Sequence, residues 1–360
     1  MPSPGALGKI RYLSRHLRRR HRTVTKPSPC RHHAQLEQSQ SHVLGAVMAV
    51  IRINAVGDTP VVHARPGPLE EEIARLGPLE GPVIVMIHGY SYKPGLPAHC
   101  PHRHILSLDP HHMPWLAPSW PRQLGFGMGR GDEGLAVAFG WNSRGRLAAA
   151  QARAIDAGRA LARLVEVLHR QAPARPIHLI GHSLGSEVVL RALKDLPVGA
   201  VERVISLSGA SYQSVATSAL TTPAGRAVEF FNITSRENDT FDFLFETLTR
   251  RPNRNDRAIS KGISAPNAVT LQIDCLETLE QLSRMGHPLG LPERRVCHRS
   301  TYLRPGALRL YRQLMRHPEQ IPLTRIQSSV PTAPEPRWSR LLRLRPQPGA
   351  VPIWQRIELG

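Results

Sequence analysis

The chain has 360 residues, of which 41% are hydrophobic and 5% aromatic, and its formal net charge is +20. This length suffices for one large α/β domain or two modest ones. No apolar run approaches the roughly 20 residues needed to cross a bilayer, because the best candidate, beginning at His42, is too short. These values exclude a transmembrane protein and predict a soluble one.

The positive charge is concentrated at the two ends of the chain. Residues 1–47 carry nine Lys or Arg against one acid, a net +8, and residues 323–360 carry a further net +4. The remaining excess is spread over the middle, without the interleaving of basic and aromatic residues that stacks nucleic-acid bases. We therefore expect no specific nucleic-acid partner, although a basic end could adhere weakly to anionic surfaces.

The composition of the ends also predicts where the folded part begins and stops. Residues 1–47 have no sustained apolar period and read as a disordered basic arm, unless the native protein starts at Met48. Residues 48–322 form the predicted domain, and residues 323–360 read as a Pro- and Arg-rich tail. The four cysteines, at positions 30, 100, 275 and 297, form no close-spaced framework, which favours a reducing, cytoplasmic location.

Beyond residue 48 the predicted strands and helices alternate. A hairpin at 48–67 turns at Gly57-Asp58, and a short helix at 70–76 precedes a strand at 82–90. A long Pro- and His-rich loop covers 91–131. The later predicted strands lie at 134–141, 177–180, 201–210, 228–231 and 267–274, and the later helices lie at 144–171, after Ser183, at 276–286 and at 305–317. Apolar strands that alternate with helices predict a mostly parallel sheet covered on both faces.

The motif Gly181-His182-Ser183-Leu184-Gly185 follows the strand at 177–180 and opens a helix. A sharp turn between strand and helix strains the serine backbone, and the flanking Gly181 and Gly185 remove side chains that would collide. Ser183 would then stand at the carboxyl edge of the sheet and at a helix N-terminus, where free N–H groups favour a developing oxyanion. The alternative is a glycine-rich turn with a spectator serine.

In this motif and its context the chain resembles the α/β-hydrolase superfamily, over most of residues 48–320. The resemblance implies a nucleophile at Ser183, followed along the chain by an acid and then a histidine. An acid is then expected after the strand at 228–231. Asp239 fits best because it lies in the loop that leaves this strand; Asp242, Glu237 and Asp274 are the alternatives.

The resemblance also selects the base and the oxyanion hole. It favours His298, which precedes Tyr302 and the last helix, over His287 and His317. His88-Gly89-Tyr90 ends an earlier strand, so the backbone N–H of Tyr90 is expected to join that of Leu184 in holding an oxyanion.

The loop at residues 99–112 contains five histidines and a cysteine. Their spacings match no tetrahedral metal site, so we expect no metal and no cofactor, and we interpret the loop as a wall or partial lid of the site. The predicted function is that of a serine hydrolase that cleaves small-molecule carboxylic esters, with thioesters or amides as further candidates. Two alternatives remain: a non-catalytic binding protein with the same fold, and a protein whose basic arm binds membrane or nucleic acid.

Overall fold

A computed structural model describes residues 50–65, 67–76, 80–111 and 118–342, with side chains described up to residue 340. The predicted arm at 1–47 and the last residues of the predicted tail lie outside this described part. Within it, none of the helices is long and apolar enough to cross a membrane.

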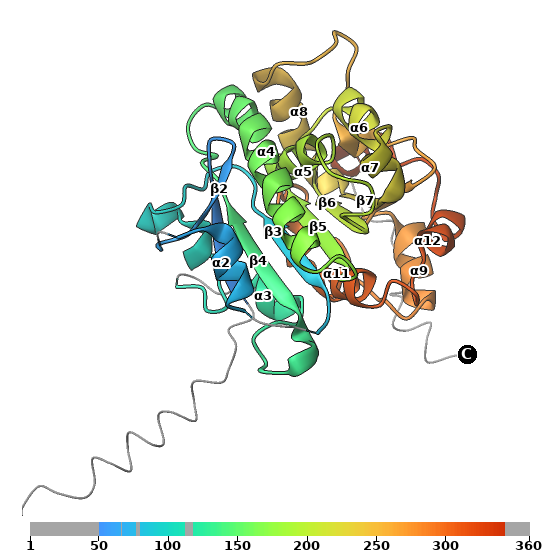
Figure 1. Ribbon diagram of the computed structural model, residues 1–360. Coiled ribbons are helices and arrows are strands. Elements are labelled where there is room, and N and C mark those ends of the chain that lie inside the picture. Colours follow the sequence, from blue (N-terminus) through green and yellow to red (C-terminus); the bar gives the residue numbers. More distant parts are fainter. Residues whose placement is uncertain (1–49, 66, 77–79, 112–117, 343–360) are drawn as a thin grey trace, which may run out of the picture. The chain divides into compact units, whose positions relative to one another are not determined.

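The centre of the described fold is an eight-stranded sheet with the strand order β2-β1-β4-β3-β5-β6-β7-β8 (Figure 1). Only β1 and β2 pair antiparallel; every other neighbouring pair is parallel. The strands are β1 (Val50–Val56), β2 (Thr59–Val62), β3 (Val83–Ile87), β4 (Leu135–Gly140), β5 (Ile177–His182), β6 (Arg203–Leu207), β7 (Glu229–Thr234) and β8 (Ala268–Gln272). The predicted mostly parallel sheet is confirmed.

Helices cover both faces of this sheet. In the described residues the α-helices are α2 (Leu69–Ala74), α3 (Trp120–Gln123), α4 (Leu147–Gln171), α5 (Leu184–Ala192), α6 (Gln213–Leu220), α7 (Pro223–Ala227), α8 (Asp239–Leu248), α9 (Leu276–Arg284), α10 (Ser300–Leu303), α11 (Ala307–Arg316), α12 (Leu323–Ser329) and α13 (Ser339–Leu342). Successive residues of each strand point to opposite faces, so Val85 packs into one hydrophobic cluster with α4 and α5, while Met86 packs into the other with α3 and α11. Figure 1 shows α4 and α5 crossing one face of the sheet.

The C-terminal boundary predicted at residue 322 differs from the structure. In α12, Leu323 and Ile326 are buried in the same cluster as α11, and Gln327 donates to the carbonyl oxygen of Ala268 in β8. The Pro and Arg content concealed this apolar pattern because only one turn of helix carries it. Residues 331–340 then continue along the carboxyl edge of the sheet, where Arg337 forms an ion pair with Glu246.

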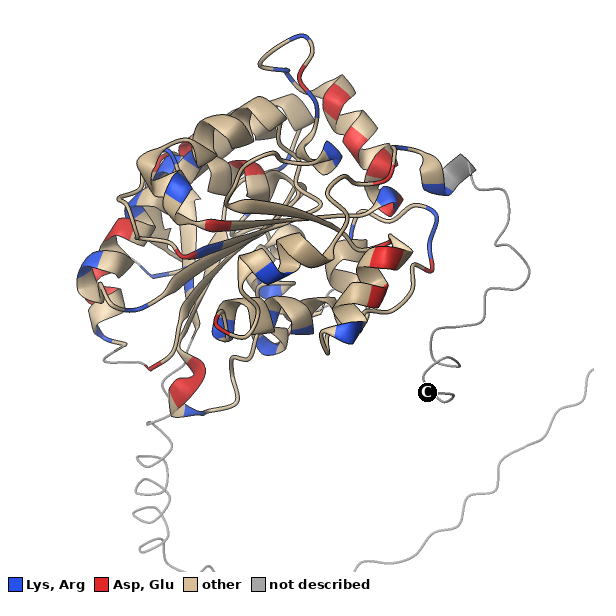
Figure 2. Ribbon diagram, turned by 90° about the vertical axis from the view of Figure 1, so that its right-hand side faces the viewer, with Lys and Arg blue, Asp and Glu red and all other residues tan. Residues whose placement is uncertain are grey.

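The charged residues of the described part are distributed over many elements. Figure 2 shows Lys and Arg on helices and loops around the sheet, interleaved with Asp and Glu. The arginines inside the fold are tied to acids or carbonyls. Arg203, for example, pairs with Glu229 and donates to the carbonyl oxygen of Leu314.

Candidate active site

Ser183 lies between β5 and α5 with a backbone φ of +54° and ψ of −123°. A positive φ is unfavourable for any residue with a side chain, so the surrounding structure must hold the serine in place. The carbonyl oxygen of Leu207 accepts from the Ser183 N–H at 2.9 Å, and the Ser183 carbonyl oxygen accepts from the N–H groups of Ser186 and Ala210. The strained turn predicted from the sequence is therefore present.

Glycines allow the turn to pack tightly against its neighbours. A Cβ at Gly181 would lie 2.8 Å from the carbonyl oxygen of Gly185, and a Cβ at Gly185 would lie 2.6 Å from the carbonyl oxygen of Ile87. A Cβ at Gly89 would lie 2.7 Å from the Cβ of Ser183. All three distances are shorter than real carbon contacts, so any other residue would push α5 or the end of β3 away from Ser183.

The two predicted oxyanion donors come from two chain segments that meet at Ser183. Leu184 is the first residue of α5, and Tyr90 follows Gly89 at the end of β3. Among the described residues, no acceptor is found for the N–H of either one. An N–H at the start of a helix has no partner within that helix, so the Leu184 N–H is available as a hydrogen-bond donor.

His88 anchors the strand end that carries Tyr90. Its Nε2 accepts from the N–H of Trp141 at 3.0 Å, so the proton is on Nδ1, which donates to the carbonyl oxygen of Gly89 at 2.8 Å. Burial lowers the pKa of His88 to about 3, so this ring stays neutral. We interpret His88 as a support for the backbone and not as a base.

His298 lies at the carboxyl edge of the sheet, between two aromatic rings. The ring of Phe241 stacks on it at a centroid distance of 4.6 Å, and the ring of His182 lies at 4.6 Å on a tilted plane. Nε2 of His182 faces the carbonyl oxygen of His298 at 3.1 Å, which ties the residue before Ser183 to the histidine loop. Burial, followed by the charges of His182 and Arg299, lowers the pKa of His298 well below 6.5. The neutral form of the His298 ring is therefore favoured.

The partner of His298 is not the predicted acid. Nδ1 of His298 contacts Oδ1 of Asn238 at 2.6 Å, and Nδ2 of Asn238 donates to Oδ1 of Asp242 at 2.8 Å. The side chain next to the histidine is therefore an amide, and a buried carboxylate stands behind it. The loop after β7 does reach His298, but through Asn238 and not through the predicted Asp239.

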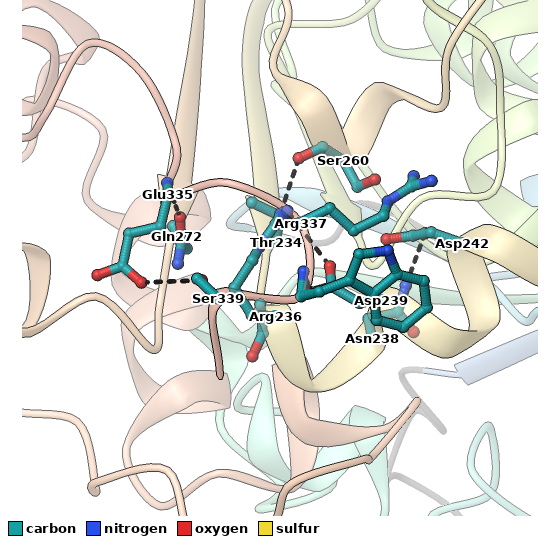
Figure 3. A network of polar contacts seen from close by, with 12 residues as sticks. Thr234, Arg236, Asn238, Asp239, Asp242, Ser260, Gln272, Glu335, Arg337 and Ser339 are labelled. Atoms are coloured by element: carbon teal, nitrogen blue, oxygen red, sulfur yellow. Dashed lines mark hydrogen bonds and ion pairs between the residues drawn. The ribbon is translucent and has the colours of Figure 1, made fainter. Parts of the chain in front are cut away.

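Asp239 is directed away from His298. It begins α8, its Oδ2 accepts from the N–H of Trp338 at 2.7 Å, and its Oδ1 pairs with Arg236 at 3.3 Å (Figure 3). The alternative Glu237 is also occupied, because its carboxylate pairs with Arg304 and accepts from the N–H of Arg294. Glu237 thus fastens the segment that leads to His298.

The remaining acid alternative, Asp274, serves the backbone. Its Oδ1 accepts from the N–H of Arg236 at 2.9 Å and from Gln272 at 3.1 Å. It stabilises the turn after β7, and it has no contact with His298 among the hydrogen bonds of the described residues.

This geometry can be compared with known proteins. A family model described as "Alpha/beta hydrolase of unknown function (DUF900)" matches residues 78–223, the segment from β3 to the start of α7 that contains Ser183. The chain has the α/β-hydrolase fold, and this segment of it is similar to that family. A search of curated proteins gives no match.

Solved structures similar to this chain include an acetylxylan esterase, which is 11% identical and has a TM-score of 0.29. The alignment covers 70% of this chain and 99% of the esterase. An iodinated complex of acetyl xylan esterase is likewise 11% identical, with a TM-score of 0.29 and coverage of 69% and 98%.

The protein has a cavity of about 660 Å³ that Ser183, Asn238 and His298 all line. Its walls are mostly apolar or aromatic and include Tyr90, Tyr92, Leu147, Phe241, Leu244 and Leu248. No hydrogen bond joins the Ser183 hydroxyl to His298 in the described part of the chain. A cavity of this size accommodates a small organic substrate.

The other histidines of the sequence analysis occupy different places. His287 follows α9, and its N–H donates to the carbonyl oxygen of Leu282, while His317 ends α11 beside Glu319. Neither residue lines the cavity. His99 and His104 of the His-rich loop do line it, as the wall interpretation expected, and part of that loop lies outside the described residues.

The described residues contain no group of three or more His, Cys, Asp or Glu side chains placed to hold a metal ion. Cys100, Cys275 and Cys297 are free thiols, and Cys30 lies outside the described residues.

Two site features had no usable signal in the sequence. Asn238 is the contact of His298, yet its neighbour Asp239 carries the residue type expected there. Ser91 and Ser208 also have positive φ angles, of 79° and 42°, and both line the cavity. A turn signal that uses glycine or asparagine would not find a strained serine.

Proposed function

We propose that this α/β hydrolase is a serine hydrolase that cleaves carboxylic esters through an acyl-enzyme. Ser183 is the nucleophile and His298 the general base in this proposal. The observation that carries it is the strained backbone of Ser183, which stands at a helix N-terminus on the same cavity as His298.

The hydrogen bonds around His298 assign its tautomer. An ionised Asp242 only accepts, so the amide nitrogen of Asn238 faces Asp242 and its oxygen faces His298. Nδ1 of His298 must then donate to that oxygen at 2.6 Å, which leaves Nε2 with a lone pair. Nε2 can take the proton of the serine hydroxyl as Oγ bonds to the ester carbon, and it returns that proton to the departing alcohol.

The two backbone N–H groups complete the proposed chemistry. As Oγ attacks, negative charge develops on the carbonyl oxygen of the ester, and in this proposal the N–H groups of Tyr90 and Leu184 bind it. Water then attacks the acyl-enzyme, again with His298 as the base, and releases the acid. The apolar walls favour an apolar acyl group over a charged one, since each buried methylene contributes about 0.8 kcal/mol.

The experiment is a panel of p-nitrophenyl esters and thioesters of increasing acyl length, with matched anilides. Ser183→Ala should abolish turnover, while Ser218→Ala, the same change on an exposed site of α6, should retain it. Turnover by Ser183→Ala equal to that of the wild type would exclude the assignment. The length at which kcat/KM stops rising would measure the acyl part of the cavity.

One observation favours a second candidate, a non-catalytic binding protein. The group in contact with His298 is a neutral amide, and a neutral group stabilises an imidazolium less well than a carboxylate does. A folded wild type that binds esters without turnover, across the whole panel, would support this second candidate.

A further inference from the structure

We propose that Asn238 and Asp242 together replace the single acid of the catalytic machinery: Asn238 fixes the tautomer of His298, and Asp242 supplies the negative charge through Asn238. This inference rests on the proposed function, because it assigns positioning residues to the same base. It is carried by the chain of two contacts from His298 to Asn238, 2.6 Å, and from Asn238 to Asp242, 2.8 Å.

The location of Asn238 suits a positioning residue. It ends the 3₁₀ turn at Arg236–Asn238, directly after β7, and it is 1% exposed. The next residue, Asp239, is held by Arg236 and by the N–H of Trp338, so the start of α8 cannot rotate freely (Figure 3). The Asn238 amide is thereby held between two fixed partners, and a buried side chain with both ends bonded keeps one orientation.

Asp242 lies one turn further along α8 and is 2% exposed. Its surroundings include Arg236 of the 3₁₀ turn, Arg337 of the C-terminal segment, Asp239 of its own helix and the Ser260 hydroxyl. The two arginines already have other carboxylate partners, Asp239 for Arg236 and Glu246 for Arg337. Asp242 is therefore not required to neutralise a buried cation.

Burial raises the pKa of Asp242 to about 7, and Ser260, Arg337 and Arg236 act in the opposite direction. Between about pH 4 and 7 the Asp242 carboxyl group is therefore protonated in the folded protein and ionised in the unfolded chain. The free energy of unfolding consequently falls as the pH rises through this range. A carboxylate that opposes folding when it is charged points to a functional role.

Protonation of Asp242 should remove the constraint that Asp242 places on the Asn238 amide and, through it, on the tautomer of His298. A protonated carboxyl group both donates and accepts, so it can bond either end of the Asn238 amide. The amide then no longer dictates that Nδ1 of His298 carries the proton, and the negative charge that stabilises the imidazolium is gone. Activity should consequently depend on the charge of Asp242 and not only on its shape.

The first test variant is Asp242→Asn, which keeps the size of the side chain and an oxygen able to accept from Asn238. If Asp242 acts only structurally, this change leaves kcat unaltered. Under our proposal, kcat at pH 8 falls by about tenfold or more, which is less than the loss expected for an acid in direct contact with the base. Asp242 also lines the cavity, so kcat and KM are measured separately, and the loss should fall on kcat.

The pH dependence gives a sharper readout. The ratio of wild-type kcat/KM to that of Asp242→Asn should be largest at pH 8 and approach one as the pH falls below 7. The control is Asp256→Asn, which removes another buried carboxylate, one that accepts from Ser214 and is not connected to His298. Its ratio to the wild type should not change with pH. An equal kcat for Asp242→Asn at pH 8, or a ratio that does not vary with pH, would overturn the proposal.

A rescue variant and a spectroscopic measurement complete the test. The double variant Asn238→Asp with Asp242→Asn exchanges amide and carboxylate, and it should recover most of the lost kcat. No recovery in a folded double variant would contradict the proposed role of the negative charge.

¹⁵N NMR of the His298 ring reports its tautomer without any substrate. The wild type at pH 8 should show a proton on Nδ1, and Asp242→Asn should show a mixture. The same tautomer in both proteins refutes the inference even if the wild type has no esterase activity, which separates its failure from that of the proposed function.

Discussion

Replacing Gly185 by alanine tests the geometry on which the proposed nucleophile depends. The new Cβ would lie 2.6 Å from the carbonyl oxygen of Ile87 and 2.7 Å from that of His88, and both are backbone atoms of the end of β3. Neither atom can move aside as a flexible side chain could. Relief of the clash must therefore separate α5 from β3, which also moves the N–H of Leu184 away from that of Tyr90.

The magnitude follows from known costs of overpacking. One methyl group forced into a packed site costs about 1–3 kcal/mol, and the position here, against two carbonyl oxygens, belongs at the upper end. Each kcal/mol corresponds to about 2 °C in the midpoint of thermal unfolding for a domain of this size. We expect Gly185→Ala to lower the midpoint by about 4–6 °C and to lower kcat for esters by at least tenfold.

The assay combines scanning calorimetry with ester hydrolysis. Gly131→Ala is the matched control, because a Cβ at that exposed position meets no atom within 4 Å. Its midpoint should stay within about 1 °C of the wild type, since surface changes of this kind stay within about 0.5 kcal/mol. If Gly185→Ala unfolds like the control and retains its activity, the close approach of α5 to β3 does not hold the site together.

Three further predictions concern the base, the C-terminal segment and the arm. His298→Ala should lose about 10²-fold or more in kcat, while His287→Ala should be unaffected, because His298 lines the cavity and His287 does not; equal losses would contradict the assignment. Arg337→Gln should lower the free energy of unfolding by about 3 kcal/mol, since it leaves Glu246 buried without its partner, whereas Arg163→Gln, which breaks an exposed pair with Asp58, should cost under about 1 kcal/mol; chemical denaturation measures both. A chain that begins at Met48 should unfold at nearly the same temperature as the full chain and hydrolyse the same esters; loss of folding would show that residues 1–47 contribute to the core.

Much of the fold could be predicted from the sequence because its signals are local. The apolar runs that became β3, β4 and β5 are short, continuous and bounded by glycine or proline, and α4 has a long helical period. The hairpin turn at Gly57-Asp58 joins β1 and β2 as expected. Helix α12 was missed because its two buried positions, Leu323 and Ile326, make too short a pattern among Pro and Arg.

Only those parts of the candidate site that depend on a local sequence motif or on the order of residues along the chain could be predicted. Ser183, with its flanking glycines, was identifiable because strain and close packing restrict the residue types at such a turn. The partner of His298 depends on the backbone conformation of the loop after β7. This loop directs Asn238 to the histidine and Asp239 to Arg236 and Trp338. Trp338 comes from a segment about 100 residues away in the chain, so no local pattern could reveal that contact.

The most direct test of the central claim is covalent labelling of the folded wild type with a fluorophosphonate, followed by mass spectrometry of the peptides. The account predicts one phosphonyl group on the peptide that contains Ser183, slower labelling in His298→Ala, and none in Ser183→Ala. Labelling that persists in Ser183→Ala, that maps to another residue, or that is absent from the folded wild type would contradict the claim that Ser183 is the nucleophile.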